Sequence, residues 1–564
     1  MKKLWVLGLL FCGQWVRAQD NLVHMNEYYH SIIMSEEISN GYLWKHHTSI
    51  RPMYQDVLLK DLLNDSTSRS YLRSNQTGIK YLIKENANYF VYHPDSNHNN
   101  INYSNKRTSL LKYIYPVPAY FIAYHGKSGY FNINPLLDLK WGFETDRSDP
   151  LLMNRRGIRI QGGIDNKVFF TTELIESQST FLSYVNDYVE EQRTLPGVGF
   201  LKQYKSKLFG IQHGYDYLIA EADIHFKASK HIDISFGHGR QFIGSGERSL
   251  FLSDFSAPHF YLKFLTTIGR VNYLNCFSEL TSESKYFDDA DRLLSKKYLA
   301  AHYLSYNVTK KWNVGLFESI VFSRKKNFEF QYLNPIILYR SVEQAVGSPD
   351  NVMIGLNTNL DLFKSIRLYG QIILDEFVLK QVIIDNQGWW ANKYGIQLGF
   401  KYVNVASIKN LNLLSELNLV RPYTYSFRDS TANYAHNHQA LAHPLGSNFK
   451  EWVIKLDYRL GKKWYLQSRN FISTKGLDTL ENNFGGNILK PNISHNADFN
   501  NVIGQGEMRF LTHLELNISY ALWHNVWLDI DGGIRNTTLN KESSLTYWFQ
   551  GGVRMNLDRK RMDF

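Results

Sequence analysis

Residues 219–239 alternate strictly between apolar and polar side chains. Ala220, Ile224 and Phe226 fall on one face of an extended chain, whereas the odd-numbered residues between them are charged or polar. After a short turn at Ser229 the same alternation resumes. A period of two is typical of a β-strand with one apolar and one polar face. This stretch therefore predicts an amphipathic hairpin, and most of the following sequence repeats its pattern.

From Phe131 onward, short turns alternate with long connections. The short turns lie near residues 164–167, 228–231, 267–270, 308–311, 363–366, 406–410, 460–463 and 522–525. The longer connections lie near residues 146–153, 177–217, 241–259, 281–295, 323–350, 379–388, 428–449, 474–505 and 540–543. Transmembrane barrels have tight turns at their periplasmic end and longer loops at their outer end. The predicted fold class is therefore all-β, an antiparallel outer-membrane β-barrel of about 18 strands.

The composition suits such a barrel. Aromatic residues make up 15% of the chain, with 37 Tyr and 34 Phe but only 13 Pro, which is typical of many strands and aromatic girdles. The net charge is +11, but no compact basic patch with interleaved aromatic residues is present, so we expect no nucleic-acid partner. The positive charge is better explained by attraction to outer-membrane lipid such as lipopolysaccharide, or to an acidic polysaccharide, than by a nucleic-acid partner.

The N-terminus predicts an exported protein. Lys2 and Lys3 precede an apolar run, and Ala18 ends a short segment that resembles a signal-peptidase site. Residues 1–18 are therefore predicted to be a cleaved signal peptide.

The cysteines and the lack of apolar helices restrict the location further. Phe11 is too bulky to precede a lipidated Cys12, so Cys276 is expected to be the only cysteine of the mature chain and to form no intramolecular disulfide. No later stretch reaches the roughly eighteen apolar residues of a membrane helix. The predicted location is the outer membrane of a Gram-negative bacterium.

The chain divides into two predicted parts after the signal peptide. Residues 19–125 do not follow the strand pattern, and helical periodicity at 24–38 and 54–65 predicts a small, partly helical periplasmic or plug region. The alternative is a flexible leader with one docking helix. Residues 126–564 are predicted to form the barrel.

The end of the chain allows two interpretations. Apolar residues on one face predict a last strand at 545–557, and the chain ends on Phe564 after the charged run 558–561. Either Leu557 closes the strand and the tail hangs in the periplasm, or the strand continues further.

The sequence contains no persuasive catalytic set, cofactor motif or metal motif. Gly244-Ser245-Gly246 lacks the context of a nucleophile elbow, and no Walker A, HExxH or paired-cysteine pattern occurs. The pairs His46–His47 and His436/His438 lie in polar segments of the sequence, and we interpret them as solvated loop histidines. We therefore expect no enzyme activity, no cofactor and no metal; an outer-membrane lipase with scattered Ser and His residues is the enzymatic alternative.

The segment 240–264 is dense in glycine, charge and hydroxyl groups. Its structural interpretation is a loop folded into the lumen and tied by an Arg248–Asp254 or Arg240–Glu247 pair. Its functional interpretation is a polar surface for a glycan, where arginine meets acidic groups and aromatic rings stack on sugar faces. Gly244 and Gly246 permit backbone conformations that other residues avoid.

The stretch GRQFIGSGERSLFLSDFSAP within this segment resembles the motif of Wzi-type capsule assembly proteins and of the related RemB-type gliding-motility outer-membrane proteins. HHTSIRP at residues 46–52 is similar to a short N-terminal segment of those relatives. The resemblance implies an eighteen-stranded barrel, an N-terminal helical plug and a role in surface polysaccharide attachment or surface motility. The signature residues are Arg240, Gln241, Gly244, Gly246, Arg248, Ser249, Ser253 and Asp254.

The resulting hypothesis is a non-enzymatic outer-membrane barrel that binds or organises surface polysaccharide, as in capsule or exopolysaccharide assembly. The first alternative is a barrel whose outer loops bind a protein adhesin or a motility or secretion complex. The second is a channel, and a plugged lumen argues against it.

Overall fold

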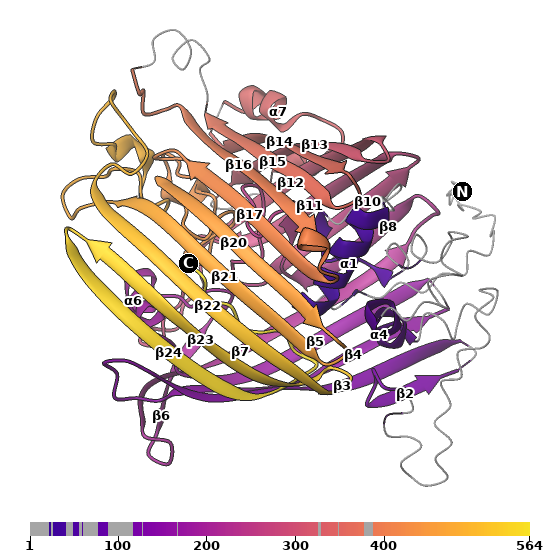
Figure 1. The fold of residues 1–564 in the computed structure, drawn as a ribbon. Helices are drawn as coiled ribbons and strands as arrows, with labels where there is room; N and C mark the ends of the chain where they lie inside the picture. The colour runs from indigo at the N-terminus through magenta and orange to yellow at the C-terminus, as the bar shows by residue number, and fades with distance from the viewer. Residues whose placement is uncertain are drawn as a thin grey trace, which may run out of the picture.

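The chain closes into a single barrel of eighteen antiparallel strands in the computed structural model (Figure 1). The structure describes residues 22–23, 26–40, 49–55, 59, 77–87, 115, 117–126, 128–165, 167–324, 329–347, 349–376 and 387–564. The predicted signal peptide, His46–His47 and most of the predicted helix at 54–65 lie outside the described residues. The fold class and the strand count are confirmed.

Each wall strand pairs with its neighbours in the chain, and the last strand pairs with the first. The wall strands are β3 (Gly129–Glu144), β4 (Leu151–Ile164), β5 (Val168–Ser179), β7 (Ile211–Lys227), β8 (Ile232–Gly239), β10 (His259–Ile268), β11 (Val271–Thr281), β12 (Lys296–Thr309), β13 (Trp312–Phe322), β14 (Asn351–Leu362), β15 (Ile366–Glu376), β16 (Lys393–Val403), β17 (Leu411–Val420), β20 (Phe449–Leu460), β21 (Trp464–Leu477), β22 (Glu507–Trp523), β23 (Val526–Leu539) and β24 (Glu542–Met555). Closure joins β24 to β3, with Phe549 opposite Phe143. Two shorter strands, β2 (Ile122–His125) and β6 (Leu201–Ser206), extend the edges of β3 and β7.

The predicted alternation of connections is also found. The eight short turns lie at one end of the barrel, here the turn end, and the other connections lie at the opposite end, the loop end. The loop-end connections are long except for the one between β23 and β24, which has only two residues, Asn540 and Lys541. In outer-membrane barrels the loop end faces the outside of the cell.

Side chains alternate across the wall as the sequence predicts. In β20, Trp452 and Leu456 are exposed on the outer surface, whereas Lys455 and Asp457 are buried on the lumenal side. The outward-facing apolar side chains form a band around the barrel, and exposed aromatic side chains lie at both edges of this band. They are Trp141, Phe143, Trp452, Phe510, Tyr547 and Phe549 toward the loop end, and Phe226, Tyr306, Trp312, Phe363, Trp464 and Trp523 toward the turn end. Such paired girdles mark the two water–lipid boundaries of a membrane barrel.

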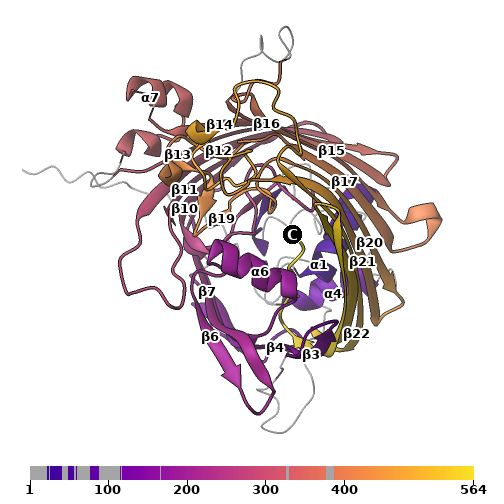
Figure 2. The ribbon, with the colours of Figure 1, turned by 90° about the vertical axis from the view of Figure 1, so that its left-hand side faces the viewer.

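The described N-terminal elements lie inside the ring of strands (Figure 2). They are α1 (Glu27–Asn40), α4 (Thr77–Glu85) and β1 (Ile50–Arg51). Polar wall residues hold α1: Asn412 donates to Ser35 Oγ at 3.1 Å, and Arg367 forms an ion pair with Glu37 at 2.8 Å. Among the described residues, no helix is long and apolar enough to cross a membrane.

A hydrophobic core fills the lumen toward the loop end. Leu250, Phe251 and Leu252 of the connection after β9 (Phe242–Ile243) are fully buried there. The Phe251 ring stacks on the Phe317 ring of the wall, with centroids 4.6 Å apart. Residues from the connection between β17 and β20 complete the core, and they include Tyr425, Tyr434, Leu441 and Leu445. A water-filled channel through such a barrel has a polar lumen. The packed apolar core that the described residues form here leaves no such channel toward the loop end.

The remaining elements belong to loop-end connections. They are α6 (Ser183–Gln192), α7 (Tyr339–Ala345), the 3₁₀ turns η2 (Phe330–Leu333), η5 (Ser430–Ala432) and η6 (Asn492–Ser494), and the short strands β18 (Ala435–His436) and β19 (Gln439–Ala440). One further 3₁₀ turn, η4 (Val405–Ser407), lies at the turn end between β16 and β17. Helix α6 caps the lumen from within, whereas α7 lies outside the wall (Figure 2).

The C-terminal tail, residues 556–564, corrects both interpretations of the chain's end. Strand β24 ends at Met555, two residues earlier than predicted, and the tail turns back into the lumen instead of hanging in the periplasm or continuing the strand. Leu557 packs in a buried cluster with wall residues and with α6. Phe564 reaches Tyr188 of α6, with ring centroids 4.7 Å apart.

Candidate functional site

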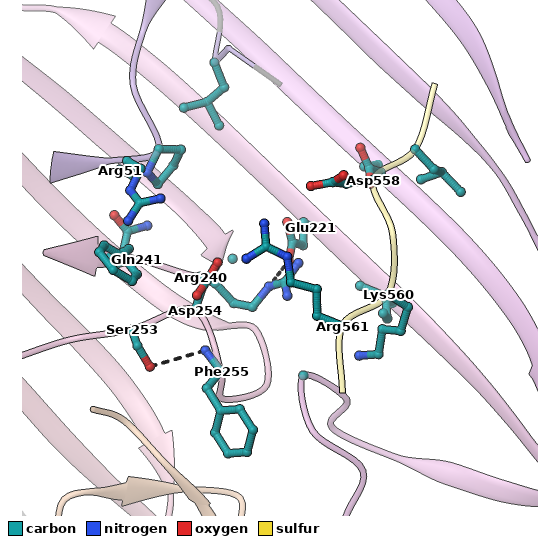
Figure 3. Close-up of a pocket in the computed structure, with 18 of the residues that line it drawn as sticks. Arg51, Glu221, Arg240, Gln241, Ser253, Asp254, Phe255, Asp558, Lys560 and Arg561 are labelled. Carbon is teal, nitrogen blue, oxygen red and sulfur yellow. Dashed lines mark hydrogen bonds and ion pairs between the residues drawn. The ribbon is translucent and has the colours of Figure 1, made fainter. Parts of the chain in front are cut away.

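A cavity of about 390 Å³ lies within the lumen, and the signature segment forms part of its lining. Most of its lining comes from four parts of the chain: the N-terminal segment, the wall strands from β4 to β8, the residues around β9, and the C-terminal tail (Figure 3). Tyr261 of β10 and Lys455 of β20 also contribute. Of the signature residues, Arg240, Gln241, Arg248, Ser253 and Asp254 contribute to this lining.

The two stretches that carry the resemblance pair with each other. Strand β1 is antiparallel to β9, with Ile50 opposite Ile243 and Arg51 opposite Phe242. The Arg51 guanidinium lies 3.7 Å above the centre of the Phe242 ring. The backbone N–H of Gly244 continues the pairing by donating to Ser49 O at 2.8 Å.

The two glycines of the signature are needed for different reasons. Gly244 has φ of +154°, which favours glycine. At Gly246 the constraint is space, because a Cβ atom would lie 2.1 Å from Glu416 Oε2. The prediction that both glycines supply unusual backbone conformations is therefore correct only for Gly244.

Wall side chains hold the backbone of the loop after β9. Glu416 accepts hydrogen bonds from the N–H groups of Glu247 at 2.9 Å and Arg248 at 3.1 Å. Gln371 accepts from Leu250 N at 2.8 Å, and Gln397 donates to Arg248 O at 3.1 Å. A buried loop needs partners for its peptide groups, and these three wall residues supply them.

The two signature serines also fix the loop, one within it and one to a neighbouring connection. Ser249 Oγ donates to Ile243 O at 2.5 Å, and Ser253 Oγ donates to the carbonyl of Ala442. Both serines are buried. Their hydroxyl groups therefore fix the loop and its neighbour instead of facing a ligand.

Arg248 is buried and ion-paired, but not with the predicted partner. Its guanidinium contacts Glu451 Oε1 at 3.1 Å and Asp563 Oδ1 at 3.4 Å, and it lies over the Phe471 ring. The predicted Arg248–Asp254 pair is therefore wrong. Glu451 is shared with His443, whose Nε2 lies 2.7 Å from it.

The predicted Arg240–Glu247 pair is also wrong. Arg240 donates to Glu221 of β7 at 2.7 Å, whereas Glu247 forms ion pairs with Lys455 at 3.1 Å and Arg561 at 2.9 Å. Burial alone would raise the pKa of the Glu247 carboxyl, but Lys455 and Arg561 hold that pKa well below its ordinary value. Glu247 is therefore ionised and joins the loop to the wall and to the tail.

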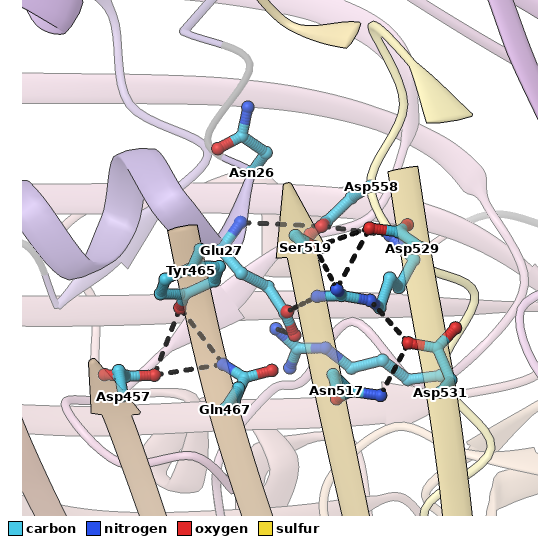
Figure 4. A network of polar contacts seen from close by, with 12 residues as sticks. Asn26, Glu27, Asp457, Tyr465, Gln467, Asn517, Ser519, Asp529, Asp531 and Asp558 are labelled. Carbon is cyan, nitrogen blue, oxygen red and sulfur yellow. Dashed lines mark hydrogen bonds and ion pairs between the residues drawn. The ribbon is translucent and has the colours of Figure 1, made fainter. Parts of the chain in front are cut away.

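The C-terminal tail is the part of the site that sequence reasoning missed. Arg559 lies 3.2 Å from each of Glu27 Oε2, Asp529 Oδ1 and Asp531 Oδ1. Figure 4 shows these three carboxylates together. Arg561 pairs with Glu27 at 2.7 Å as well as with Glu247. The basic run after Leu557 was visible in the sequence, but two of its partners, Glu27 and Glu247, are hundreds of residues away in the chain.

The cavity carries charges of both signs in near balance. Nine basic and eight acidic side chains line it. Asp254 is exposed to the cavity, and its charge acts on Arg51, Arg240 and Arg561. Burial, and then the charge of Arg240, lowers the pKa of the Lys560 amine well below its ordinary value. The cavity can hold a small polar molecule, but its balanced charge gives it little attraction for a polyanion.

The interpretation of His436 and His438 as solvated loop histidines is wrong. His436 is buried, and its Nδ1 accepts from Thr281 N at 3.0 Å. His438 is half-buried, with its Nδ1 2.9 Å from Ser284 Oγ. Within the described part of the chain, no group of His, Cys, Asp and Glu side chains is arranged to hold a metal ion.

A second cluster lies in the loop-end connections and was not singled out from the sequence. The Trp390 ring stacks on His495, with centroids 4.1 Å apart, and Trp389 and Tyr423 contact Trp390 at an angle. Both tryptophans are partly exposed. Trp390 N donates to Asp498 O at 2.9 Å, which joins this connection to the one between β21 and β22. Two adjacent tryptophans in a loop, at 389–390, are the sequence feature that would have indicated this cluster.

Comparison with solved structures supports the fold. The Escherichia coli protein Wzi, an outer membrane protein involved in group 1 capsule assembly and described as a carbohydrate-binding β-barrel, matches with a TM-score of 0.53. The match has 12% identity and covers 96% of this chain and 100% of Wzi. OprD of Pseudomonas aeruginosa matches at 11% identity over 75% of this chain and 94% of its own, with a TM-score of 0.41. No protein-family model and no curated protein sequence matches the chain.

Proposed function

We propose that this protein is a non-enzymatic outer-membrane barrel that binds surface polysaccharide at its loop end. The observation that carries the proposal is the closed loop end, where a packed core fills the lumen and the connections carry the partly exposed Trp389–Trp390 cluster. A barrel built in this way holds a ligand on its outer surface instead of conducting it. The similar fold of Wzi, a carbohydrate-binding barrel, supports the same conclusion.

The Trp389–Trp390 cluster has the chemistry that sugar recognition needs. Indole faces stack on the apolar faces of sugar rings, and nearby amide and carboxylate groups bind hydroxyls. Asn500 and Asn501 lie beside this cluster, because their N–H groups donate to Gln387 and Gly388. The cavity residues Arg240, Gln241 and Asp254 are the second candidate site for a sugar, and the buried side-chain nitrogen of Gln241 has no hydrogen-bond partner among the described residues.

The alternative function is a loop-end platform for a protein adhesin or for a motility or secretion complex. The same exposed aromatic residues would serve it, since aromatic side chains also dominate protein interfaces. The link to gliding motility that the RemB-type resemblance implies stays a prediction. The channel alternative is disfavoured by the core around Phe251.

Calorimetric titration of the purified barrel with polysaccharide extracted from the same cells tests the proposal. We expect saturable binding that is weakened in Trp389→Ala/Trp390→Ala and unchanged in Trp464→Ala/Trp523→Ala, which removes two tryptophans from the turn end. Weakening only in Arg240→Ala/Asp254→Asn would move the site into the cavity. Native protein that binds no polysaccharide would contradict the proposal and favour a protein partner.

A further inference from the structure

The hairpin of β6 and β7 extends beyond the barrel wall at the loop end (Figures 1 and 2). Strand β6 pairs with the first residues of β7, from Leu201 opposite Tyr217 to Ser206 opposite Ile211. The turn between them, residues 207–210, carries Leu208, which is 85% exposed. A single exposed apolar side chain is common on protein surfaces, so Leu208 is informative only together with its neighbours.

The tip of this hairpin lies at the outer boundary of the apolar band. The Phe209 ring packs against Trp141, with centroids 6.2 Å apart. Trp141 points outward from β3, three residues from its loop end, and belongs to the loop-end aromatic girdle. Girdle residues mark the level of the lipid headgroups. The position of Phe209 therefore places the neighbouring residues at headgroup level on the outer face.

The hairpin is basic as well as apolar at its tip. Lys202, Lys205 and Lys207 are exposed, and residues 201–215 contain no acidic residue. Lys202 stands opposite Asp216 in the strand pairing. Among the described residues, none forms an ion pair with Lys205 or Lys207, although most other charged clusters of this protein are paired.

The spacing of the two unpaired lysines suits one anionic group. Lys205 lies at an irregularity of the β6–β7 pairing and Lys207 lies in the turn. Residues two apart are separated by at most about 7 Å, so two flexible lysine side chains can converge on one phosphate. Leu208 follows directly in the turn and is exposed. Basic groups beside an exposed apolar tip match a ligand that has a phosphorylated headgroup above a hydrocarbon portion.

We propose that the β6–β7 hairpin is a binding site for a phosphorylated lipid of the outer leaflet. Lys205 and Lys207 hold the headgroup phosphate, and Leu208 and Phe209 enter the hydrocarbon beneath it. This inference goes beyond polysaccharide binding, because it concerns the lateral surface of the barrel and a different ligand. It gives the protein a fixed lipid neighbour beside its outer loops.

Native mass spectrometry of the full-length barrel in detergent tests the proposal with diphosphoryl lipid A as the probe. We expect the native protein to retain this lipid and Lys205→Gln/Lys207→Gln to bind it at least about tenfold more weakly. The matched control is Lys364→Gln/Lys409→Gln, which removes two exposed lysines from turn-end turns, and its binding should equal that of the native protein. Leu208→Ser should weaken binding without changing its salt dependence.

Two further probes identify the source of the phosphate. Lipid A without phosphate groups should bind as weakly as the lysine variant does with the diphosphoryl form. Inorganic phosphate in excess should compete poorly, because it lacks the hydrocarbon portion. The proposal is overturned if the lysine variant binds diphosphoryl lipid A as the native protein does, if the phosphate-free lipid binds equally well, or if the turn-end control loses as much affinity.

Discussion

Replacing Arg559 with alanine is expected to lower the free energy of unfolding of the barrel by about 3 to 5 kcal/mol. The guanidinium is 5% exposed and lies 3.2 Å from three carboxylates of two separate elements, Glu27 of α1 and Asp529 and Asp531 of β23. Its loss adds one uncompensated negative charge to a buried network. Other cations remain around these carboxylates and reduce the penalty. We therefore expect the loss of unfolding free energy that is typical of one broken buried ion pair, not of three.

Urea titration of the protein refolded in detergent micelles measures this effect. The transition is followed by tryptophan fluorescence and by the mobility shift of the folded barrel on gels, and the midpoint at unchanged slope gives the change in stability. Arg193→Ala is the matched control, because that arginine pairs with Asp288 and Asp289 but is 43% exposed. We expect this control to lose no more than about 1 kcal/mol.

A double-mutant cycle locates the effect. Arg559→Ala combined with Glu27→Gln should show a coupling energy of about 1 to 3 kcal/mol, because the two side chains share one buried network. A loss in Arg559→Ala no larger than that in Arg193→Ala, or a coupling energy near zero, would refute the reasoning. It would mean that the tail does not stabilise the lumen in solution.

Three further outcomes are expected. Gly246→Ala should destabilise by about 1 to 3 kcal/mol, whereas Gly199→Ala, with open space at its Cβ, should change stability by under about 0.5 kcal/mol in the same titration. Burial, and then the charges of His259 and Lys297, lower the pKa of His436 in the folded protein. The unfolded chain therefore binds a proton more readily, and the free energy of unfolding should fall by about 1 kcal/mol for each pH unit below pH 6.5. The fall should be smaller in His436→Gln. Deleting residues 19–125 should leave bilayer conductance low, because the core around Phe251 still closes the lumen; large channels would contradict that.

The barrel wall could be predicted because its signal is local. Alternation such as that from Ala220 to Phe226 repeats every two residues, and the turn between two strands is a continuous stretch of sequence. The same locality explains the wrong ion pairs. The sequence suggested partners for Arg248 and Glu247 within their own loop, whereas the partners found are 203 and 314 residues away. No periodicity encodes contacts that arise only when a sheet closes on itself.

The lumenal network also implies an order of assembly. Glu27 near the N-terminus pairs with Arg559 and Arg561 near the C-terminus, and Arg561 in turn pairs with Glu247 of the loop after β9. The tail that carries Arg559 and Arg561 begins where β24 ends, and β24 closes the barrel by pairing with β3, so we expect these groups to meet late in assembly. Before closure each charge is hydrated and the ordering of its side chain is unfavourable. The network therefore stabilises the closed barrel without guiding its formation, and substitutions in it should accelerate unfolding more than they slow folding.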